Sequence, residues 1–165
     1  HLVALLTQKN MKITFAESCT GGLLASSITR INGASAVFDG SLVTYANQIK
    51  EDWINVSPQT LITHGAVSEH TVVEMANGAL DKSNADIVVA VSGVAGPTGG
   101  SEDKPVGTVN IAWGTTDVIN TCCLSIPTSR YHFQHYVTAI SLDLVRRMLI
   151  NSQETPRYLI ERKKA

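Results

Sequence analysis

The chain lacks the charge and the long apolar runs that mark nucleic-acid-binding or membrane proteins. Its 165 residues hold 13 Lys and Arg against 14 Asp and Glu, a net charge of −1, and neither sign forms a long block. This balance gives no support to a nucleic-acid or membrane partner. The longest apolar stretches, such as residues 87–91, are far shorter than the roughly 20 residues of a membrane-spanning helix, and no signal peptide is visible. These absences favour a small-molecule partner.

Cysteine is scarce, and the residues that bind structural metals are not clustered. The three cysteines are Cys19, Cys122 and Cys123. Adjacent cysteines rarely bridge each other, so a reducing compartment such as the cytoplasm fits best. There is no CxxC pair and no Cys/His cluster at zinc spacing, and we expect no metal site. His132 and His135, three residues apart, have no third ligand nearby and are expected to lie on an ordinary helix face.

Hydrophobic periodicity predicts one α/β domain over residues 1–152, followed by a polar C-terminal tail at residues 153–165. The predicted strands are residues 12–16, 41–45, 86–92, 106–113 and 118–125. The predicted helices are residues 21–31, 47–54, 58–64, 69–82 and 130–150. The continuous apolar run at residues 87–91 is typical of a strand covered by helices on both faces. We therefore predict a three-layer α/β/α sandwich around a mixed, mostly parallel sheet with an antiparallel edge.

Two glycine-rich corners follow predicted strands, at the carboxyl ends where ligands bind in such sheets. Residues 16–22 read AESCTGG, with hydroxyls directly before a helix and paired glycines that let a ligand approach backbone N–H groups. Ser18 or Thr20 can also be a plain helix cap. Residues 93–100 read GVAGPTGG and form either a substrate or phosphate loop or a long structural turn. A P-loop and a GxGxxG fingerprint are both absent.

A serine that attacks a carbonyl at neutral pH needs an adjacent base, and a buried lysine with a lowered pKa can supply one. Lys50 is the candidate base for Ser18, and Tyr45 is either a proton relay or a packing residue. Cys19 is either a second nucleophile at a helix N-terminus or an inert packed thiol. Lys104 is either a phosphate partner or a surface charge.

Five motifs follow one another along the chain. They are AESCTGGL at residues 16–23, VTYANQIK at 43–50, GAVS at 65–68, GVAGPTGG at 93–100 and KPVGTV at 104–109. Together they resemble the CinA C-terminal domain family, and the resemblance extends to about Leu149. That family includes the bacterial nicotinamide mononucleotide deamidases, which hydrolyse the carboxamide of nicotinamide mononucleotide to the nicotinate form and ammonia.

The resemblance implies a cytoplasmic bacterial amidohydrolase, commonly a homodimer, that needs no metal or organic cofactor. The family's serine, tyrosine and lysine fall on Ser18, Tyr45 and Lys50. Ser18 is expected to attack the amide carbon, Lys50 and Tyr45 to manage the protons, and N–H groups at the first helix start to hold the oxyanion. The substrate-binding residues expected on this basis are Cys19, Thr20, Gly21, Gly22, Asn47, Gly96, Pro97, Thr98, Gly99, Gly100 and Arg130.

The chain departs from the family pattern at positions that bear on the substrate. Ser41 and Ala46 stand where the family usually has glycine and serine. Before the last helix the family often has Gly-Asp-Arg and an arginine four residues later, where this chain has Thr128-Ser129-Arg130 and Gln134. Glutamine cannot make the forked, charge-assisted contact of arginine. Two alternatives therefore stay open: a non-catalytic module that binds a nucleotide or a partner, and a hydrolase of a related unphosphorylated amide. The start at His1 leaves open a preceding leader or domain.

Overall fold

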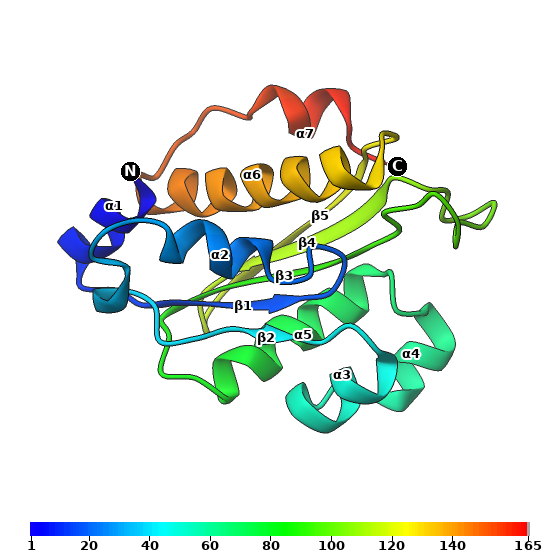
Figure 1. Ribbon diagram of the computed structural model, residues 1–165, viewed down its shortest axis with the longest axis horizontal. Coiled ribbons are helices and arrows are strands. Elements are labelled where there is room, and N and C mark those ends of the chain that lie inside the picture. Colours follow the sequence, from blue (N-terminus) through cyan, green and yellow to red (C-terminus); the bar gives the residue numbers. More distant parts are fainter. Residues whose placement is uncertain (165) are drawn as a thin grey trace.

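The computed structural model describes residues 1–164, in which a five-stranded sheet separates two layers of helices (Figure 1). The strands are β1 (Ile13–Glu17), β2 (Leu42–Val43), β3 (Ile87–Gly93), β4 (Thr108–Gly114) and β5 (Ile119–Ser125), in the order β2-β1-β3-β4-β5. β1 pairs in parallel with β2 and β3, whereas β3–β4 and β4–β5 are antiparallel. The predicted mixed sheet is confirmed, with parallel and antiparallel pairings in equal number.

Helices cover both faces of the sheet. One layer holds α1 (Leu2–Lys9), α2 (Leu23–Thr29) and the long α6 (Arg130–Leu149), and a short 3-10 helix (Ala34–Ala36) follows α2. The opposite layer holds α3 (Asn47–Ile54), α4 (Pro58–His64) and α5 (Glu69–Asp81). The three-layer prediction is therefore confirmed. Within residues 1–164, no helix combines the length and the apolar character needed to cross a membrane.

Strand β3 lies at the centre of the sheet and contributes to a core on each face. Ile87, Val89 and Val91 belong to the cluster on the α6 side, and Val88 and Ala90 belong to the cluster on the α5 side. All five are fully buried. Successive side chains of a strand point to opposite faces, so a strand covered on both faces is apolar throughout. The continuous apolar run in the sequence has this cause.

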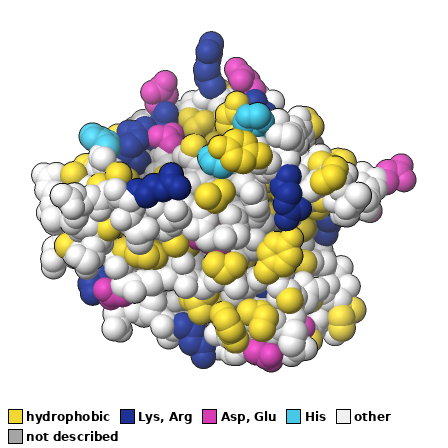
Figure 2. All heavy atoms as spheres, viewed as in Figure 1, with side chains coloured by type: hydrophobic (Ala, Val, Ile, Leu, Met, Phe, Trp, Pro, Cys, Tyr) yellow, Lys and Arg dark blue, Asp and Glu magenta, His cyan; other side chains and the backbone are white. Residues whose placement is uncertain are grey.

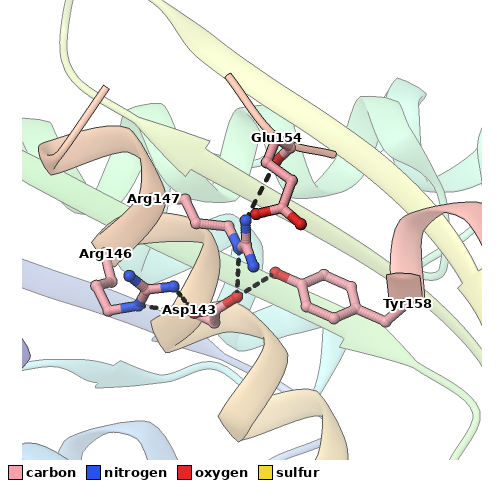
Figure 3. A network of polar contacts seen from close by, with 5 residues as sticks. All are labelled: Asp143, Arg146, Arg147, Glu154 and Tyr158. Atoms are coloured by element: carbon pink, nitrogen blue, oxygen red, sulfur yellow. Dashed lines mark hydrogen bonds and ion pairs between the residues drawn. The ribbon is translucent and has the colours of Figure 1, made fainter. Parts of the chain in front are cut away.

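Two helices lie outside the predicted elements. α1 precedes residue 12, where the predicted elements begin, and it packs on α6 with Leu6 fully buried. α7 (Arg157–Glu161) lies in the predicted tail. Figure 3 shows how Tyr158 and Arg147 converge on Asp143 of α6, with the Tyr158 hydroxyl 2.8 Å and Arg147 Nε 2.7 Å from its carboxylate. The last residue, Ala165, lies outside the described part of the chain.

Candidate active site

A pocket of about 260 Å³ opens beyond the carboxyl ends of β1 and β3. α2 leaves β1 on one face of the sheet and α3 to α5 lie on the other, so this edge is where an open α/β sheet binds ligands. The two glycine-rich corners of the sequence meet there, as predicted. The residues that line the pocket are Ser18, Cys19, Tyr45, Lys50, Ala66, Val67, Ser92, Gly93, Val94, Ala95, Gly96, Thr98, Gly99 and Arg130.

Lys50 and Ser18 meet at the bottom of this pocket. The Lys50 side chain comes from the first turn of α3 and is only 1% exposed. Its Nζ lies 3.3 Å from Ser18 Oγ, 2.7 Å from the Thr44 carbonyl and 3.0 Å from the Tyr45 carbonyl. Burial lowers the pKa of Lys50 below its ordinary value of 10.5, because the desolvated ammonium is disfavoured. A neutral amine donates two hydrogen bonds, which the two carbonyls can accept, and its lone pair is then available to the Ser18 hydroxyl.

Backbone hydrogen bonds from the sheet hold both members of this pair. The Ser18 N–H donates to the Val91 carbonyl of β3 at 3.1 Å. The Thr44 N–H donates to the Glu17 carbonyl of β1 at 2.8 Å, which fixes the segment whose carbonyls bind Lys50 Nζ. The distance between Ser18 and Lys50 is therefore set by the register of adjacent strands.

The corner after β1 is organised by Glu17, a residue that the sequence did not single out. Its carboxylate is fully buried and accepts hydrogen bonds from Thr20 Oγ1 at 2.7 Å and from three backbone N–H groups at 3.0 Å. Those N–H groups belong to Gly22, Leu24 and Ala25 at the start of α2. Neither Ser18 nor Thr20 caps the helix, since its N-cap is Gly22 and Thr20 donates to Glu17.

The expected oxyanion site at the start of α2 is wrong as stated, because those N–H groups already bond to Glu17. The N–H of Cys19 has no acceptor among residues 1–164. The carbonyl of the same peptide unit, that of Ser18, accepts from the Gly21 N–H at 3.2 Å. In a trans peptide the N–H points opposite to the carbonyl, so the Cys19 N–H is directed away from this turn. Cys19 lines the pocket next to Ser18, so its N–H is a candidate donor to a ligand bound there.

Tyr45 and Arg130 border the pocket mouth. The Tyr45 side chain is 61% exposed, and its hydroxyl accepts from Arg130 Nη2 at 2.9 Å. Arg130 Nη1 donates to the Gly96 carbonyl, also at 2.9 Å. Tyr45 therefore reaches Lys50 through its backbone carbonyl, whereas its hydroxyl bonds to Arg130. Figure 2 shows hydrophobic side chains at the surface of the molecule. In and between β2 and α3, the exposed large hydrophobic residues are Val43, Tyr45 and Trp53.

The second glycine-rich corner supplies backbone N–H groups to the same pocket. Gly96 and Gly99 have φ values of 74° and 89°, in the left-handed region that favours glycine. The N–H groups of Ala95, Gly96, Thr98 and Gly99 donate no hydrogen bond within the described chain, residues 1–164. Backbone N–H groups left free in a glycine-rich turn can bind anions. With the Arg130 guanidinium beside them, they make this end of the pocket suited to a negatively charged group.

Six of the predicted site residues lie outside the pocket lining. They are Thr20, Gly21, Gly22, Asn47, Pro97 and Gly100. Thr20 and the two glycines shape the corner instead, whereas Asn47 is exposed at the start of α3. Lys104 lies after the second corner and outside the pocket lining, and it donates to the His64 carbonyl at the end of α4.

Six pocket residues were not singled out individually as site residues: Gly93, Val94 and Ala95 in the second glycine-rich corner, and Ala66, Val67 and Ser92 outside it. The Ser92 hydroxyl donates to the Ala66 carbonyl at 2.7 Å and fixes the wall between β3 and α5. The sequence signals of Ala66, Val67 and Ser92 were the GAVS motif at residues 65–68 and a serine near the end of the most buried strand.

Gln134 does not line the pocket itself, but it contacts Cys19, which does. Gln134 Nε2 donates to the Cys19 carbonyl at 2.9 Å, so this side chain braces the nucleophile corner from α6. Burial raises the pKa of the Cys19 thiol to about 12, which makes it the inert packed thiol of the two alternatives. His132 and His135 bond locally to Ser129 Oγ and the Tyr131 carbonyl. Residues 1–164 contain no group of three His, Cys, Asp or Glu side chains that can hold a metal.

Comparison with known proteins finds one matching family and many similar sequences. Residues 1–149 match the family model of the CinA C-terminal domain. A CinA-like protein of Colwellia psychrerythraea is 52% identical over 162 residues, which cover 98% of this chain and 38% of that protein. A CinA-like protein of Fervidobacterium nodosum is 46% identical over 149 residues, covering 90% of this chain and 36% of that protein. The chain thus spans well under half the length of these curated relatives.

Solved structures share the fold. A CinA superfamily protein from Klebsiella pneumoniae superposes with a TM-score of 0.88 at 33% identity, covering 91% of this chain and 94% of that one. The competence/damage-inducible protein CihA from Agrobacterium tumefaciens gives a TM-score of 0.86 at 39% identity, covering 88% and 89%. By sequence and by fold, this chain belongs to the CinA C-terminal domain family.

Proposed function

We propose that this chain hydrolyses the carboxamide of nicotinamide mononucleotide to nicotinate mononucleotide and ammonia. The observation that carries the proposal is the contact between Lys50 Nζ and Ser18 Oγ at 3.3 Å. A buried amine with a lowered pKa beside a serine hydroxyl is a base and nucleophile pair. The substrate comes from the resemblance to family members that act on this nucleotide.

In the first half of the reaction, Ser18 Oγ attacks the carboxamide carbon while Lys50 Nζ accepts the hydroxyl proton. The carbonyl oxygen becomes an oxyanion, which the Cys19 N–H stabilises by a hydrogen bond. Lys50 then donates its added proton to the amide nitrogen as the carbon–nitrogen bond breaks. Ammonia leaves, and the nicotinoyl group is held as an ester on Ser18.

In the second half, water attacks the ester carbon and Lys50 accepts a proton from it. When the carbon–oxygen bond to Ser18 breaks, Lys50 returns that proton to Ser18 Oγ. One water is consumed, one ammonia is released and no redox change occurs. The carboxyl group of the product loses its proton to solvent, and the pair returns to its starting state.

The anion end of the pocket supports a phosphorylated substrate. Arg130 and the four residues with N–H groups unpaired within residues 1–164, Ala95, Gly96, Thr98 and Gly99, all line the pocket, and Arg130 donates to the Gly96 carbonyl. In the proposal they hold the phosphate, while the carboxamide lies against Ser18. Tyr45 holds Arg130 through its hydroxyl and Lys50 through its carbonyl, so it connects the two ends.

The test is ammonia release from nicotinamide mononucleotide by the wild type and by Ser18→Ala and Lys50→Met. Both variants should lose at least about 10³-fold in kcat, since each removes a member of a unit that acts together. Lys104→Met is the matched control. Lys104 also donates to a backbone carbonyl, that of His64, but outside the pocket lining, and this variant should stay within a few-fold of wild type.

Two comparison substrates separate the alternatives. Release from nicotinamide riboside but not from the nucleotide would replace the proposal with hydrolysis of an unphosphorylated amide. A folded wild type that releases ammonia from neither these nor free nicotinamide would refute the deamidase and favour a binding module. Full activity in Lys50→Met would refute Lys50 as the base.

A further inference from the structure

We infer that Glu17 is a positioning residue for the nucleophile: its carboxylate closes the corner that carries Ser18 and sets the aim of the Ser18 hydroxyl. The inference rests on the proposed function, in which Ser18 attacks the substrate. Glu17 does not line the pocket and touches no reacting atom. It acts through the backbone on either side of Ser18.

The carboxylate joins the end of β1 to the first turn of α2. Glu17 is the last residue of β1, and its Oε2 accepts from Thr20 Oγ1, the Gly22 N–H and the Leu24 N–H. Its Oε1 accepts from the Ala25 N–H at 3.0 Å. The chain between these anchors is the corner that includes Ser18. A strand end and a helix start held to one buried carboxylate leave this corner little freedom to move.

The backbone of Glu17 also connects the nucleophile to its base. The Glu17 carbonyl accepts from the Thr44 N–H, and the Thr44 carbonyl accepts from Lys50 Nζ. The next residue, Ser18, is held by its own N–H to β3. Rotation of Glu17 therefore shifts Ser18 Oγ relative to Lys50 Nζ. The two groups are already 3.3 Å apart, so a small outward shift breaks their hydrogen bond.

The donors around this site specify a carboxylate. Four donors point at one buried side chain, and an ionised carboxylate is the side chain that accepts without donating. The partial positive charge of a helix N-terminus adds to the preference for a negative group. Glutamine has the same length, but it presents an NH₂ group to one of these donors. Glu17→Gln therefore disturbs the corner without opening a cavity.

The chain contains a matched control. Glu74 accepts from the Ser57 N–H at 2.7 Å and from Thr60 Oγ1 at 2.6 Å, so it serves the start of α4 as Glu17 serves the start of α2. Glu74 does not line the pocket. Any effect of losing a helix-capping carboxylate on stability alone should appear in Glu74→Gln as well.

The experiment measures kcat and KM for nicotinamide mononucleotide, the melting temperature, and the rate at which phenylmethylsulfonyl fluoride labels Ser18, read by mass spectrometry. In Glu17→Gln we expect kcat to fall by about 10²-fold, the loss that a misplaced reacting group produces, with KM nearly unchanged. Ser18 labelling should slow in parallel. Glu74→Gln should lower the melting temperature but keep the wild-type kcat and labelling rate.

Labelling needs no substrate, so the two proposals can fail separately. A wild type that is labelled at Ser18 but leaves the nucleotide intact refutes the deamidase only, and slower labelling of Glu17→Gln then still supports the positioning role. Equal labelling of wild type and Glu17→Gln overturns that role. If Glu17→Gln does not fold, Thr20→Val removes one donor and keeps the side-chain shape. It should slow labelling several-fold, and unchanged labelling would overturn the inference.

Discussion

Lys50 is an amine held in a buried site by two neutral carbonyls, and its protonation state controls the proposed reaction. Only the neutral amine can accept the Ser18 proton. Burial lowers the pKa of Lys50 from its ordinary 10.5, so the neutral form is present at lower pH than in a free lysine. We expect kcat/KM to rise with pH through this lowered pKa and to level off above it. A profile over a pH range of about 5 to 10 tests this, with Lys104→Met showing the same curve.

The same pKa shift links Lys50 to stability. Between the lowered folded pKa and 10.5, the unfolded chain binds a proton that the folded chain does not, so the stability of the wild type rises with pH. The Lys50→Met variant lacks this pH-dependent contribution to stability. The melting temperature of Lys50→Met minus that of wild type should therefore decrease as pH approaches 10.5. A difference that stays constant with pH would show that Lys50 titrates as an ordinary lysine.

Individual residues of the site were predictable where one local motif carries the chemistry. Ser18 and Lys50 follow from a serine before paired glycines and a lysine in the next corner, and the structure brings them together. The role of Glu17 depends on donors from the following helix turn, and residue spacing does not reveal how a carboxylate folds back. The contact between Tyr45 and Arg130 joins residues 85 positions apart and requires the tertiary fold.

Helices α3 and α5 pack closely enough to make one glycine necessary for the placement of Lys50. A Cβ on Gly78 of α5 would lie 1.8 Å from the carbonyl oxygen of Ile54, the last residue of α3. Gly78→Ala gains about 1 kcal/mol of helix propensity, but the overlap forces α3 away, and overpacking costs about 1–3 kcal/mol or more. We expect a net loss of stability by chemical denaturation and reduced kcat, because α3 carries Lys50.

Asn77→Ala, on the exposed side of α5, is the control for helix propensity. It should be neutral or slightly stabilising, with wild-type kcat. If Gly78→Ala behaved in the same way, the close contact between α3 and α5 would not be required for the site.

Long, strongly patterned elements were predictable, and so were the short helices α3 and α4, whose predicted ranges match the structure, but other short elements were not. The apolar run of β3 and the periodic helix α5 agree closely with their predicted ranges. β2 shortens to Leu42–Val43, and β4 begins at Thr108 after a turn closed by the Thr108 N–H and the Pro105 carbonyl. α1 and α7 are too short to be stable alone, and tertiary packing supports them. Such helices give only a weak signal in periodicity.

At the scale of the whole molecule, the sheet order explains why distant motifs form one site. β1 and β3 are parallel neighbours, so the corner that follows Glu17 and the corner that begins at Gly93 lie at the same edge. This was predictable from the α/β pattern and the rule for carboxyl ends of strands. The path of residues 153–164 was not, because it depends on tertiary contacts: Tyr158 bonds to Asp143, and Tyr158 and Leu159 pack against the core. Residues 153–164 run along α6, and Lys163 bridges to Leu124 of β5.

The attachment of this C-terminal segment depends on Asp143 and is expected to be pH-dependent. Burial raises the pKa of Asp143, but hydrogen bonds from Arg147, Arg146 and Tyr158 outweigh this effect and bring the pKa below its ordinary 3.8. The contribution of Asp143 to stability is therefore complete above pH 3.8 and is lost as the pH falls through the lower pKa of the folded state.

Asp143→Asn should lower the melting temperature by about 2–4 °C at neutral pH, and this difference should vanish in acid. Asp39→Asn breaks only the exposed ion pair with Lys12 and should change it by less than about 1 °C. Equal shifts in the two variants, measured by circular dichroism, would show that the carboxylate does not anchor the segment.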